Sequence, residues 1–337
     1  MRPDSKPPVV VVTGASAGVG RAVVRRFARD GAHIALIARG KEGLAAAARE
    51  VEAAGGKALV LPCDVADHAA LDDAASKVEE QFGPIDIWVN VAFAGVLAPF
   101  LDVEPEDYKR VTEVTYLGQI NGTRAALKRM VPRNRGSVVL VGSALAYRGI
   151  PLQSAYCGSK HAIQGFHDSI RAELFHMKSD VHVSMVQLPG VNTPQFDWIK
   201  TTMPKKPKPA SPPYQPEVIA RAIHYAAHHR RKAIWVAYPT VEAILGDRAA
   251  SPLLDRYLGW TGYKGQQDSE PVEADRQNNL WSPVEGDRGA RGRFNSTARD
   301  SSWQLALTLN RGKVIAGVAA GVLGLGALLL RRGKSAA

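Results

Sequence analysis

The sequence contains only two cysteines, Cys63 and Cys157, among its 337 residues. Two distant cysteines exclude a disulfide framework, and they lack the spacing of a metal site, so we expect no metal. Such a composition suits a reducing compartment. A long apolar run is also missing from the N-terminus, where four valines (9–12) precede a glycine-rich turn. This run is too short for the core of a signal peptide, and we therefore expect the folded part to be cytoplasmic.

Acidic residues are outnumbered by basic ones. The chain has 43 Lys and Arg against 32 Asp and Glu, which gives a net charge of +11. Basic clusters occur at 133–135, 205–208, 228–232 and 331–334, but no nucleic-acid-binding motif accompanies them. A solvated basic face, or attraction to anionic lipid, explains this charge better, and we expect no nucleic-acid partner.

Regular alternation of two periodicities fills the chain between residues 8 and 236. Short β-rich runs occur at 9–14, 33–38, 57–65, 85–90, 137–143, 181–188 and 232–237, and amphipathic helical stretches separate them. Strands that are apolar throughout and alternate with helices predict an α/β fold, with a doubly wound parallel sheet of about seven strands. We assign this catalytic domain to residues 1–245. A chain ending near 245 is expected to keep every catalytic residue.

The last quarter of the chain divides into two parts. Residues 246–312 are polar and are predicted to form a linker with little regular structure. The alternative is that Trp260, Trp281 and Trp303 pack part of this segment against the domain. Residues 314–330 carry no charge and number 17, which just reaches the lower limit for a membrane-spanning helix. We expect a transmembrane helix over 313–332, a single-pass C-terminal membrane anchor; a buried core helix is the alternative. Gly317 and Gly321 form a GxxxG that is compatible with a homo-oligomer.

The turn after the first strand, "TGASAGVG", places Gly14, Gly18 and Gly20 where the first long helix begins. Glycine permits a tight turn and lets the backbone approach a pyrophosphate, whose charge the helix N-terminus attracts. This is the pattern of a dinucleotide site.

The end of the second strand bears on which dinucleotide binds. An acidic residue there would bond the ribose hydroxyls of NAD, but this chain has Ala38 followed by Arg39. A guanidinium favours the 2′-phosphate of NADP, so NADP is preferred over NAD; a merely exposed surface arginine is the alternative. Asp64, after the third strand, either accepts a hydrogen bond from adenine or starts a turn.

Helical spacing puts Tyr156 and Lys160 of "YCGSK" on one face, one turn apart. Lys160, together with the positive charge of an oxidised nicotinamide, is expected to lower the pKa of the Tyr156 hydroxyl. The hydroxyl would then exchange a proton with a carbonyl or an alcohol near neutral pH. Ser143, at the end of the fifth strand, is placed to hold the substrate oxygen.

Together these motifs resemble the short-chain dehydrogenase/reductase family, whose fold is the Rossmann fold. The resemblance covers residues 8–240 and implies catalysis by Ser143, Tyr156 and Lys160. The cofactor-binding residues that it implies, beside Tyr156 and Lys160, are Thr13, Gly14, Ser16, Gly18, Val19, Gly20, Arg39, Asp64, Asn90, Pro189, Gly190 and Thr193. Two departures from the family stand out: Phe93 makes the loop after Asn90 bulkier, and Thr115 replaces an asparagine that helps to hold a water in the proton relay.

These features predict an NADP(H)-dependent oxidoreductase that interconverts a carbonyl and an alcohol. Residues 192–216 occupy the position of the family's substrate loop, and their apolar side chains, with the expected membrane anchor, favour a lipophilic small-molecule substrate. The alternative is a membrane-tethered dinucleotide-binding adaptor without turnover. The physiological direction and the identity of the substrate stay open.

Overall fold

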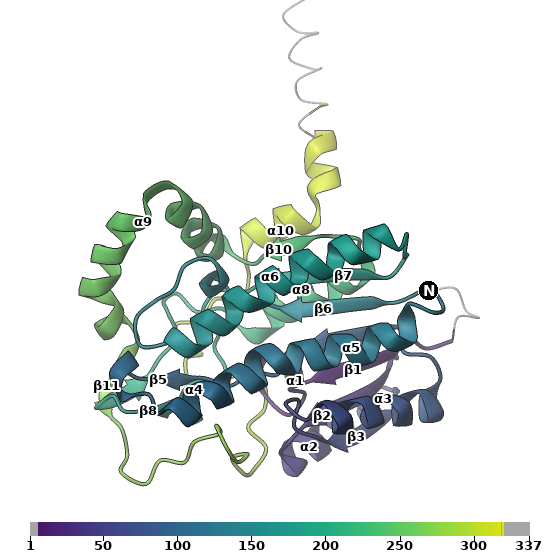
Figure 1. Cartoon of the computed structure of the whole chain (residues 1–337), viewed down its shortest axis with the longest axis horizontal. Coiled ribbons are helices and arrows are strands. Elements are labelled where there is room, and N and C mark those ends of the chain that lie inside the picture. Colours follow the sequence, from purple (N-terminus) through teal and green to yellow (C-terminus); the bar gives the residue numbers. More distant parts are fainter. Residues whose placement is uncertain (1–5, 318, 320–337) are drawn as a thin grey trace, which may run out of the picture.

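A seven-stranded parallel sheet forms the centre of the molecule, whose computed structural model describes residues 6–317 and 319 (Figure 1). The strand order is β10-β7-β6-β4-β1-β2-β3, and all neighbours pair in parallel. The strands are β1 (Val9–Thr13), β2 (His33–Ala38), β3 (Ala58–Pro62), β4 (Ile87–Asn90), β6 (Ser137–Val141), β7 (His182–Gln187) and β10 (Ala233–Trp235). The prediction of a doubly wound parallel sheet with seven strands is confirmed.

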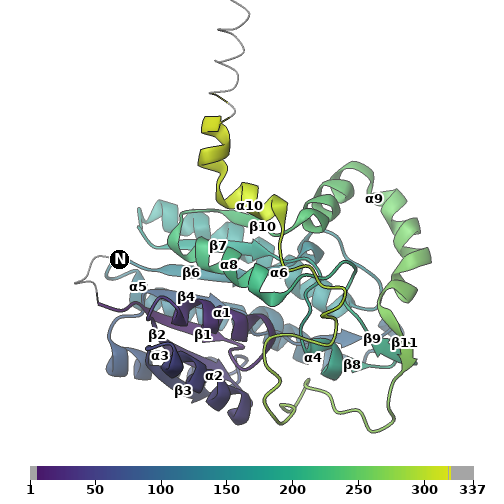
Figure 2. The same cartoon turned by 180° about the vertical axis from the view of Figure 1, so that it is seen from behind.

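Helices cover both faces of this sheet (Figures 1 and 2). One face carries α1 (Gly18–Ala28), α2 (Lys41–Ala53) and α8 (Pro216–His228); the other carries α3 (His68–Phe82), α5 (Gly118–Met130) and α6 (Ser154–His176). Side chains of β1 alternate between the two layers, since Val10 and Val12 join the α1 side while Val9 and Val11 join the α3 side. All four are buried, which explains why the strand reads as one apolar run.

The strand order reverses beside β1. The chain proceeds from β1 to β2 and β3 on one side, and then returns to β4 on the other. Ligands of doubly wound sheets bind in the crevice at such a point, outside the carboxyl ends of the strands. Short elements surround this edge of the sheet: β5 (Val96–Leu97) pairs with β8 (Lys200–Thr201), and α4 (Pro105–Thr112) leads through a π-helical turn, η2 (Glu113–Leu117), into α5.

Residues 246–265 are helical, which corrects the prediction of a linker with little regular structure over 246–312. They belong to α9 (Tyr238–Gly265), which bends at Ala250, two residues before Pro252. Proline lacks the backbone donor and crowds the preceding turn, so the helix changes direction there. The bend interrupts the register of the buried positions, and no 3.6-residue period therefore runs along the whole helix.

The remainder of the predicted linker packs onto the domain (Figure 2). After β11 (Gln267–Pro271), which pairs with β9 (Lys205–Pro207), an irregular segment runs to α10 (Trp303–Leu309). Leu280 is buried in the core on the α3 side, and Ala290 and Leu305 are buried in the core on the α1 side. A chain ending near residue 245 would keep the residues predicted to be catalytic, but it would lose part of both cores.

Most of the predicted transmembrane segment, 313–332, lies outside the described residues. Within 6–317 and 319, no helix combines the length and the apolar composition that a bilayer crossing needs. The described chain leaves the domain at α10, on the side of the molecule that also carries α9 (Figure 1).

Candidate active site

A cavity of about 740 Å³ opens at the carboxyl ends of the parallel strands. Its wall includes Arg39 and Asp64, which follow β2 and β3, and Ser143, which follows β6. Because β2 and β6 lie on opposite sides of β1, these residues line opposite ends of the cavity. The glycine turn after β1 therefore lies between them, as an elongated ligand requires.

The glycine turn has the shape of a pyrophosphate cradle. Gly14 and Gly18 have φ angles of +69° and +58°, which other residues rarely adopt, and both line the cavity with Ser16. A Cβ on Gly20 would lie 2.0 Å from the Gly14 carbonyl oxygen, so the turn closes tightly only with glycine there. Among the described residues, no acceptor pairs with the backbone amides of Val19 and Gly20, at the start of α1. Free amides at a helix N-terminus are donors for an anion.

Thr13 and Asn90 lie beside the cavity and not in its wall. The Thr13 hydroxyl oxygen accepts hydrogen bonds from the Val91 and Ala92 amides at 3.0 and 3.2 Å, which ties β1 to the loop after β4. The Asn90 amide is fully buried between Trp88 Nε1, at 2.9 Å, and the Thr123 hydroxyl, at 3.1 Å. Both side chains hold the strand ends in place, and their contact with a cofactor stays a prediction.

Tyr156, Lys160 and Ser143 meet at one end of the cavity, as the sequence predicts. α6 carries the first two residues one turn apart, with Lys160 Nζ 5.4 Å from the centre of the Tyr156 ring. Lys160 is 1% exposed and donates to the Val141 carbonyl oxygen at 2.7 Å. Phe93 packs edge-on against Tyr156 with ring centres 5.7 Å apart, so the bulkier loop contacts the Tyr156 phenol directly.

Burial controls the ionisation of this group of residues. It raises the pKa of the Tyr156 hydroxyl well above its ordinary value, although a hydrogen bond with Ser143 acts in the opposite direction. It lowers the pKa of the Lys160 ammonium to about 7. Without a bound dinucleotide, burial therefore outweighs the neighbouring amine, because removal from water disfavours the charged form of both groups. Tyr156 is protonated at neutral pH.

Thr115 lies in the π-helical turn η2, and its hydroxyl is fully engaged. It donates to the Ala94 carbonyl oxygen at 2.8 Å and accepts from the Ala94 amide at 3.0 Å. Thr115 is completely buried and is absent from the cavity wall. It therefore clamps the loop after β4, and its hydroxyl has no free donor for a relay water in the cavity.

The segment after β7 brings Pro189, Gly190 and Thr193 into the cavity wall. A Cβ on Gly190 would lie 2.4 Å from the Ala210 carbonyl oxygen, so the close approach of these two backbones requires glycine. The methyl of Thr193 lies 3.3 Å from where a Cβ on Gly18 would stand. This segment and the glycine turn thus face each other across the middle of the site.

Arg39 and Asp64 line the cavity but have partners within the chain. The Arg39 guanidinium donates to the carbonyl oxygens of Leu280 and Trp281, at 3.1 and 2.9 Å, and to that of Asn279. Asp64 pairs with Arg110. Sequence reasoning left open whether these side chains bind NADP, and it did not foresee either partner. Arg110 lies 46 residues after Asp64, and more than 200 residues separate Arg39 from residues 279–281.

The same C-terminal stretch contributes cavity residues that the sequence did not predict. They are Asn279, Pro283, Val284, Glu285, Gly286 and Arg288. Their stretch is polar and has no periodicity. The isolated Trp281 is the one signal that could have drawn attention to it.

Comparison with known proteins agrees with this arrangement. Residues 8–203 match the short chain dehydrogenase family. The uncharacterized oxidoreductase YxnA of Bacillus subtilis is 30% identical over 278 residues, which are 82% of this chain and 78% of YxnA. A 3-dehydrosphinganine reductase of Danio rerio is 32% identical over 222 residues, covering 64% of this chain and 66% of the reductase.

Solved structures share the fold of the domain. A metagenomic short-chain oxidoreductase in complex with NADP superposes with a TM-score of 0.58 at 28% identity. The superposition covers 68% of this chain and 97% of the other. The rest of this chain has no counterpart in that superposition.

Proposed function

The chain belongs to the short-chain dehydrogenase family, and from this premise we propose that it is an NADP(H)-dependent oxidoreductase that interconverts a lipophilic carbonyl compound and its alcohol. The observation that carries the proposal is the meeting of Ser143, Tyr156 and Lys160 at one end of a cavity whose middle is a glycine turn. A phenol, a hydroxyl and an amine in one pocket suit proton transfer at a carbonyl oxygen.

The residues of the cavity fit a dinucleotide. The Val19 and Gly20 amides would hold the pyrophosphate, and Pro189, Gly190 and Thr193 would flank the nicotinamide. Bound NADPH supplies the hydride that reduces the carbonyl carbon, and NADP⁺ accepts a hydride in the reverse direction. Lys41 and Arg39 give the other end of the cavity two cations, and no carboxylate follows β2 directly, which favours NADP over NAD. The solved relative with NADP supports this choice.

Tyr156 is the proton donor for reduction in this proposal. Its hydroxyl keeps its proton at neutral pH, because burial raises its pKa. The Ser143 hydroxyl holds the substrate oxygen and stabilises the charge that develops on it. In this proposal Lys160, whose pKa burial lowers to about 7, exchanges a proton near neutral pH beside the phenol.

The substrate end of the cavity favours an apolar molecule. Beside Tyr156 it is lined by Phe93, Ile150, Phe196, Trp198 and Ile199. Such walls hold an apolar chain or ring by burial and give it few hydrogen bonds. The similarity to a reductase of 3-dehydrosphinganine supports a substrate of this class.

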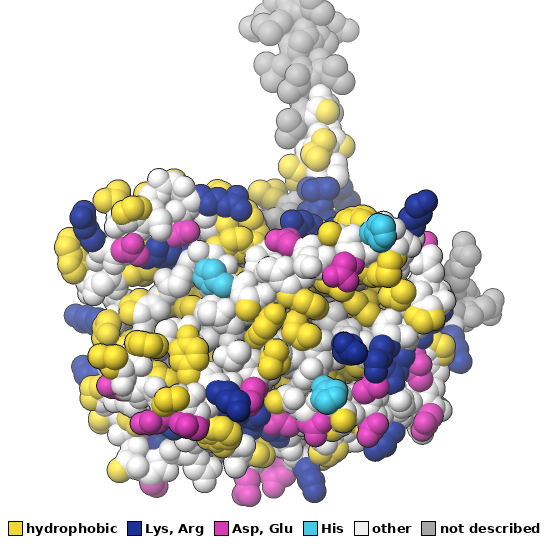
Figure 3. Space-filling view, in the orientation of Figure 1, with side chains coloured by type: hydrophobic (Ala, Val, Ile, Leu, Met, Phe, Trp, Pro, Cys, Tyr) yellow, Lys and Arg dark blue, Asp and Glu magenta, His cyan; other side chains and the backbone are white. Residues whose placement is uncertain are grey.

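We also infer that the chain works at a membrane. The apolar run 314–330 supports this inference, as does α9, where Leu253, Tyr257 and Trp260 are 64%, 57% and 83% exposed. Figure 3 displays apolar side chains on α9 beside charged ones of both signs, and exposed aromatic residues such as Tyr257 and Trp260 suit the interface of a bilayer. The catalytic domain would lie on the cytoplasmic side.

The proposal is tested with Tyr156→Phe and a matched control, Tyr147→Phe. The Tyr147 hydroxyl bonds Gln164 at 3.0 Å and lies outside the cavity wall. NADPH consumption is followed with long-chain ketones, aldehydes, steroids and quinones. We expect Tyr156→Phe to retain NADPH binding and to lose about 10²-fold or more in turnover, the scale of lost acid–base catalysis. Turnover equal to that of the control would remove Tyr156 from the mechanism, and NADPH binding without turnover of any carbonyl would support the adaptor alternative.

A further inference from the structure

Residues 279–291, which we call the strap, cross the carboxyl edge of the sheet and join its two layers. Leu280 is fully buried on the α3 side, and Ala290 is 2% exposed on the α1 side. Between these two points the strap has no regular secondary structure (Figure 2). Leu280 and Ala290 therefore anchor the two ends of the strap in opposite cores, and the residues between them have to cross from one layer to the other.

The first end of the strap is held beside the end of the cavity lined by Arg39 and Asp64, which would hold the adenosine half of the dinucleotide and is called the adenosine end. Arg39 donates to three successive carbonyl oxygens, those of residues 279–281. Trp281 Nε1 donates to Asp107 Oδ1 at 2.9 Å, and the Arg110 guanidinium lies 5.6 Å from the centre of the Trp281 ring. Charged donors on backbone carbonyls make this a strong attachment.

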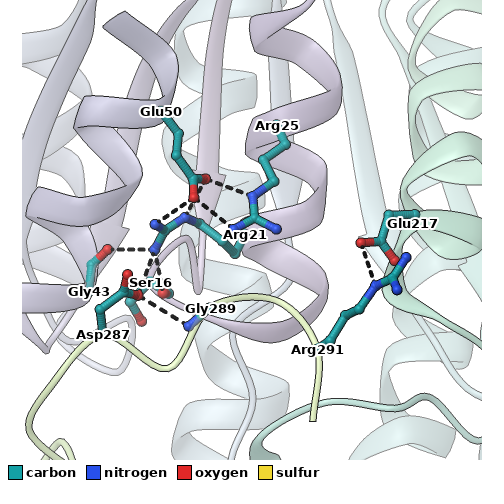
Figure 4. A network of polar contacts seen from close by, with 9 residues as sticks. All are labelled: Ser16, Arg21, Arg25, Gly43, Glu50, Glu217, Asp287, Gly289 and Arg291. Atoms are coloured by element: carbon teal, nitrogen blue, oxygen red, sulfur yellow. Dashed lines mark hydrogen bonds and ion pairs between the residues drawn. The ribbon is translucent and has the colours of Figure 1, made fainter. Parts of the chain in front are cut away.

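The second end of the strap is held on the glycine turn itself (Figure 4). The Gly18 amide donates to the Gly289 carbonyl oxygen at 3.0 Å. Asp287 Oδ1 accepts from Arg21 Nη1 at 3.2 Å and from the Gly289 amide at 3.1 Å. Arg21 is itself fixed by Glu50, at 2.7 Å, and Arg291 reaches Glu217 on α8 at 3.0 Å. Figure 4 shows Asp287 turned toward Arg21 from below α1, so the strap closes against the helix that would face the pyrophosphate.

Between its two ends the strap lines the cavity. Pro283, Glu285 and Arg288 belong to the wall, as do Gly40 and Lys41 at the start of α2. Pro283 Cβ lies 3.5 Å from the position of a Cβ on Gly40. The strap therefore packs against the segment that joins β2 to α2, at the end of the cavity lined by Arg39.

We propose that the strap is a cofactor-binding element that closes over the adenosine half of the dinucleotide and has to open for the dinucleotide to exchange. This rests on the proposed function, because it requires that the cavity binds NADP(H). Two features of the site follow from it. Arg39 anchors the strap in addition to facing the ligand, and the strap takes the Gly18 amide, which leaves the Val19 and Gly20 amides for the pyrophosphate.

A disulfide across the closed strap tests whether opening is required. The 3.5 Å between Pro283 Cβ and a Cβ on Gly40 lies within the range of disulfide geometry. The double variant Gly40→Cys with Pro283→Cys is oxidised without cofactor, and mass spectrometry verifies the bond against Cys63 and Cys157. NADPH association is then followed by fluorescence before and after reduction. We expect the oxidised form to bind NADPH at least about tenfold more slowly, because the disulfide holds the strap closed. Reduction of the disulfide should restore the association rate. Equal association rates in the two forms would overturn the proposal.

Two further controls separate the possible failures. Each single-cysteine variant, treated in the same way, should bind NADPH at the same rate before and after reduction, because it cannot form the crosslink. If the wild-type protein binds no NADPH at all, the proposed function fails. If it binds NADPH and the lock has no effect, only the role of the strap fails.

A second variant tests the strap without a crosslink. Asp287→Ala removes the contacts to Arg21 and to the Gly289 amide, and Asp287 is not in the cavity wall. Asp180→Ala is the matched control, since Asp180 pairs with Arg230 at 2.8 Å and neither residue belongs to the strap or to the cavity wall. In a chase experiment we expect Asp287→Ala to release NADPH about tenfold faster, as the loss of a charge-assisted hydrogen bond implies. Release at the rate of the control variant, with melting temperatures alike, would overturn the assignment of Asp287 as the fastening of the strap.

Discussion

Lys160 makes the stability of the cofactor-free protein depend on pH in a way that can be calculated. Burial lowers the pKa of this amine from 10.5 to about 7 in the folded state. Between these two values the unfolded chain binds more protons than the folded chain, so the free energy of unfolding rises with pH. The stabilisation is complete above 10.5 and is lost as the pH falls toward 7. The slope is at most about 1.4 kcal/mol per pH unit.

The comparison is between the wild-type protein and Lys160→Met, which keeps the length of the side chain and removes its charge. From pH 7.5 to pH 9.0 the wild-type protein should gain about 2 kcal/mol in free energy of unfolding relative to the variant, as an upper limit. Other groups titrate equally in both proteins and cancel in the difference.

The assay is urea unfolding of protein stripped of cofactor, at several pH values and constant temperature. Lys128→Met is the control, because the Lys128 side chain is 52% exposed. Its curve should run parallel to that of the wild-type protein. If the curve of Lys160→Met is also parallel, Lys160 is charged or hydrated in the folded protein, and the proposed proton exchange near neutral pH loses its basis.

The other predictions concern a buried histidine and the C-terminal part of the chain. Burial lowers the pKa of His167 to about 4, so its stabilising contribution is lost as the pH falls from about 6.5 toward 4. Against His167→Leu, the wild-type protein should lose up to about 1.4 kcal/mol per pH unit in this range, and thermal unfolding at pH 6.5 and 5.0 measures the difference. A chain ending at residue 245 should aggregate or unfold, because it lacks Leu280, Ala290 and Leu305, whereas a chain ending at 312 should fold and bind NADPH. Fractionation of full-length protein and of the chain ending at 312 after alkaline carbonate washing tests the anchor: only the full-length protein should stay with membranes, and its release would contradict the membrane proposal.

The strand–helix order and the core of the site could be predicted from the sequence because they rest on local patterns. The apolar runs determine a parallel sheet, since strands buried on both faces need apolar side chains at every position. Gly14, Gly18 and Gly20 follow a strand and begin a helix, and Tyr156 and Lys160 are one helical turn apart. These relations hold within a few residues, and the backbone geometry of the element fixes them.

What only the tertiary structure decided involves contacts between distant parts of the chain. The partners of Arg39 and of the Gly18 amide come from an irregular segment more than 200 residues away. This segment has no helical or strand periodicity from which its position could be predicted. The direction of the Tyr156 pKa depends on how much water the folded chain excludes, and one turn of helix does not determine that. The sequence by itself determined which elements form and where a cofactor turn and a catalytic pair stand on them. The folded chain decided which groups are left free to bind and in which state of ionisation, because both depend on burial and on partners that meet only when the chain closes on itself.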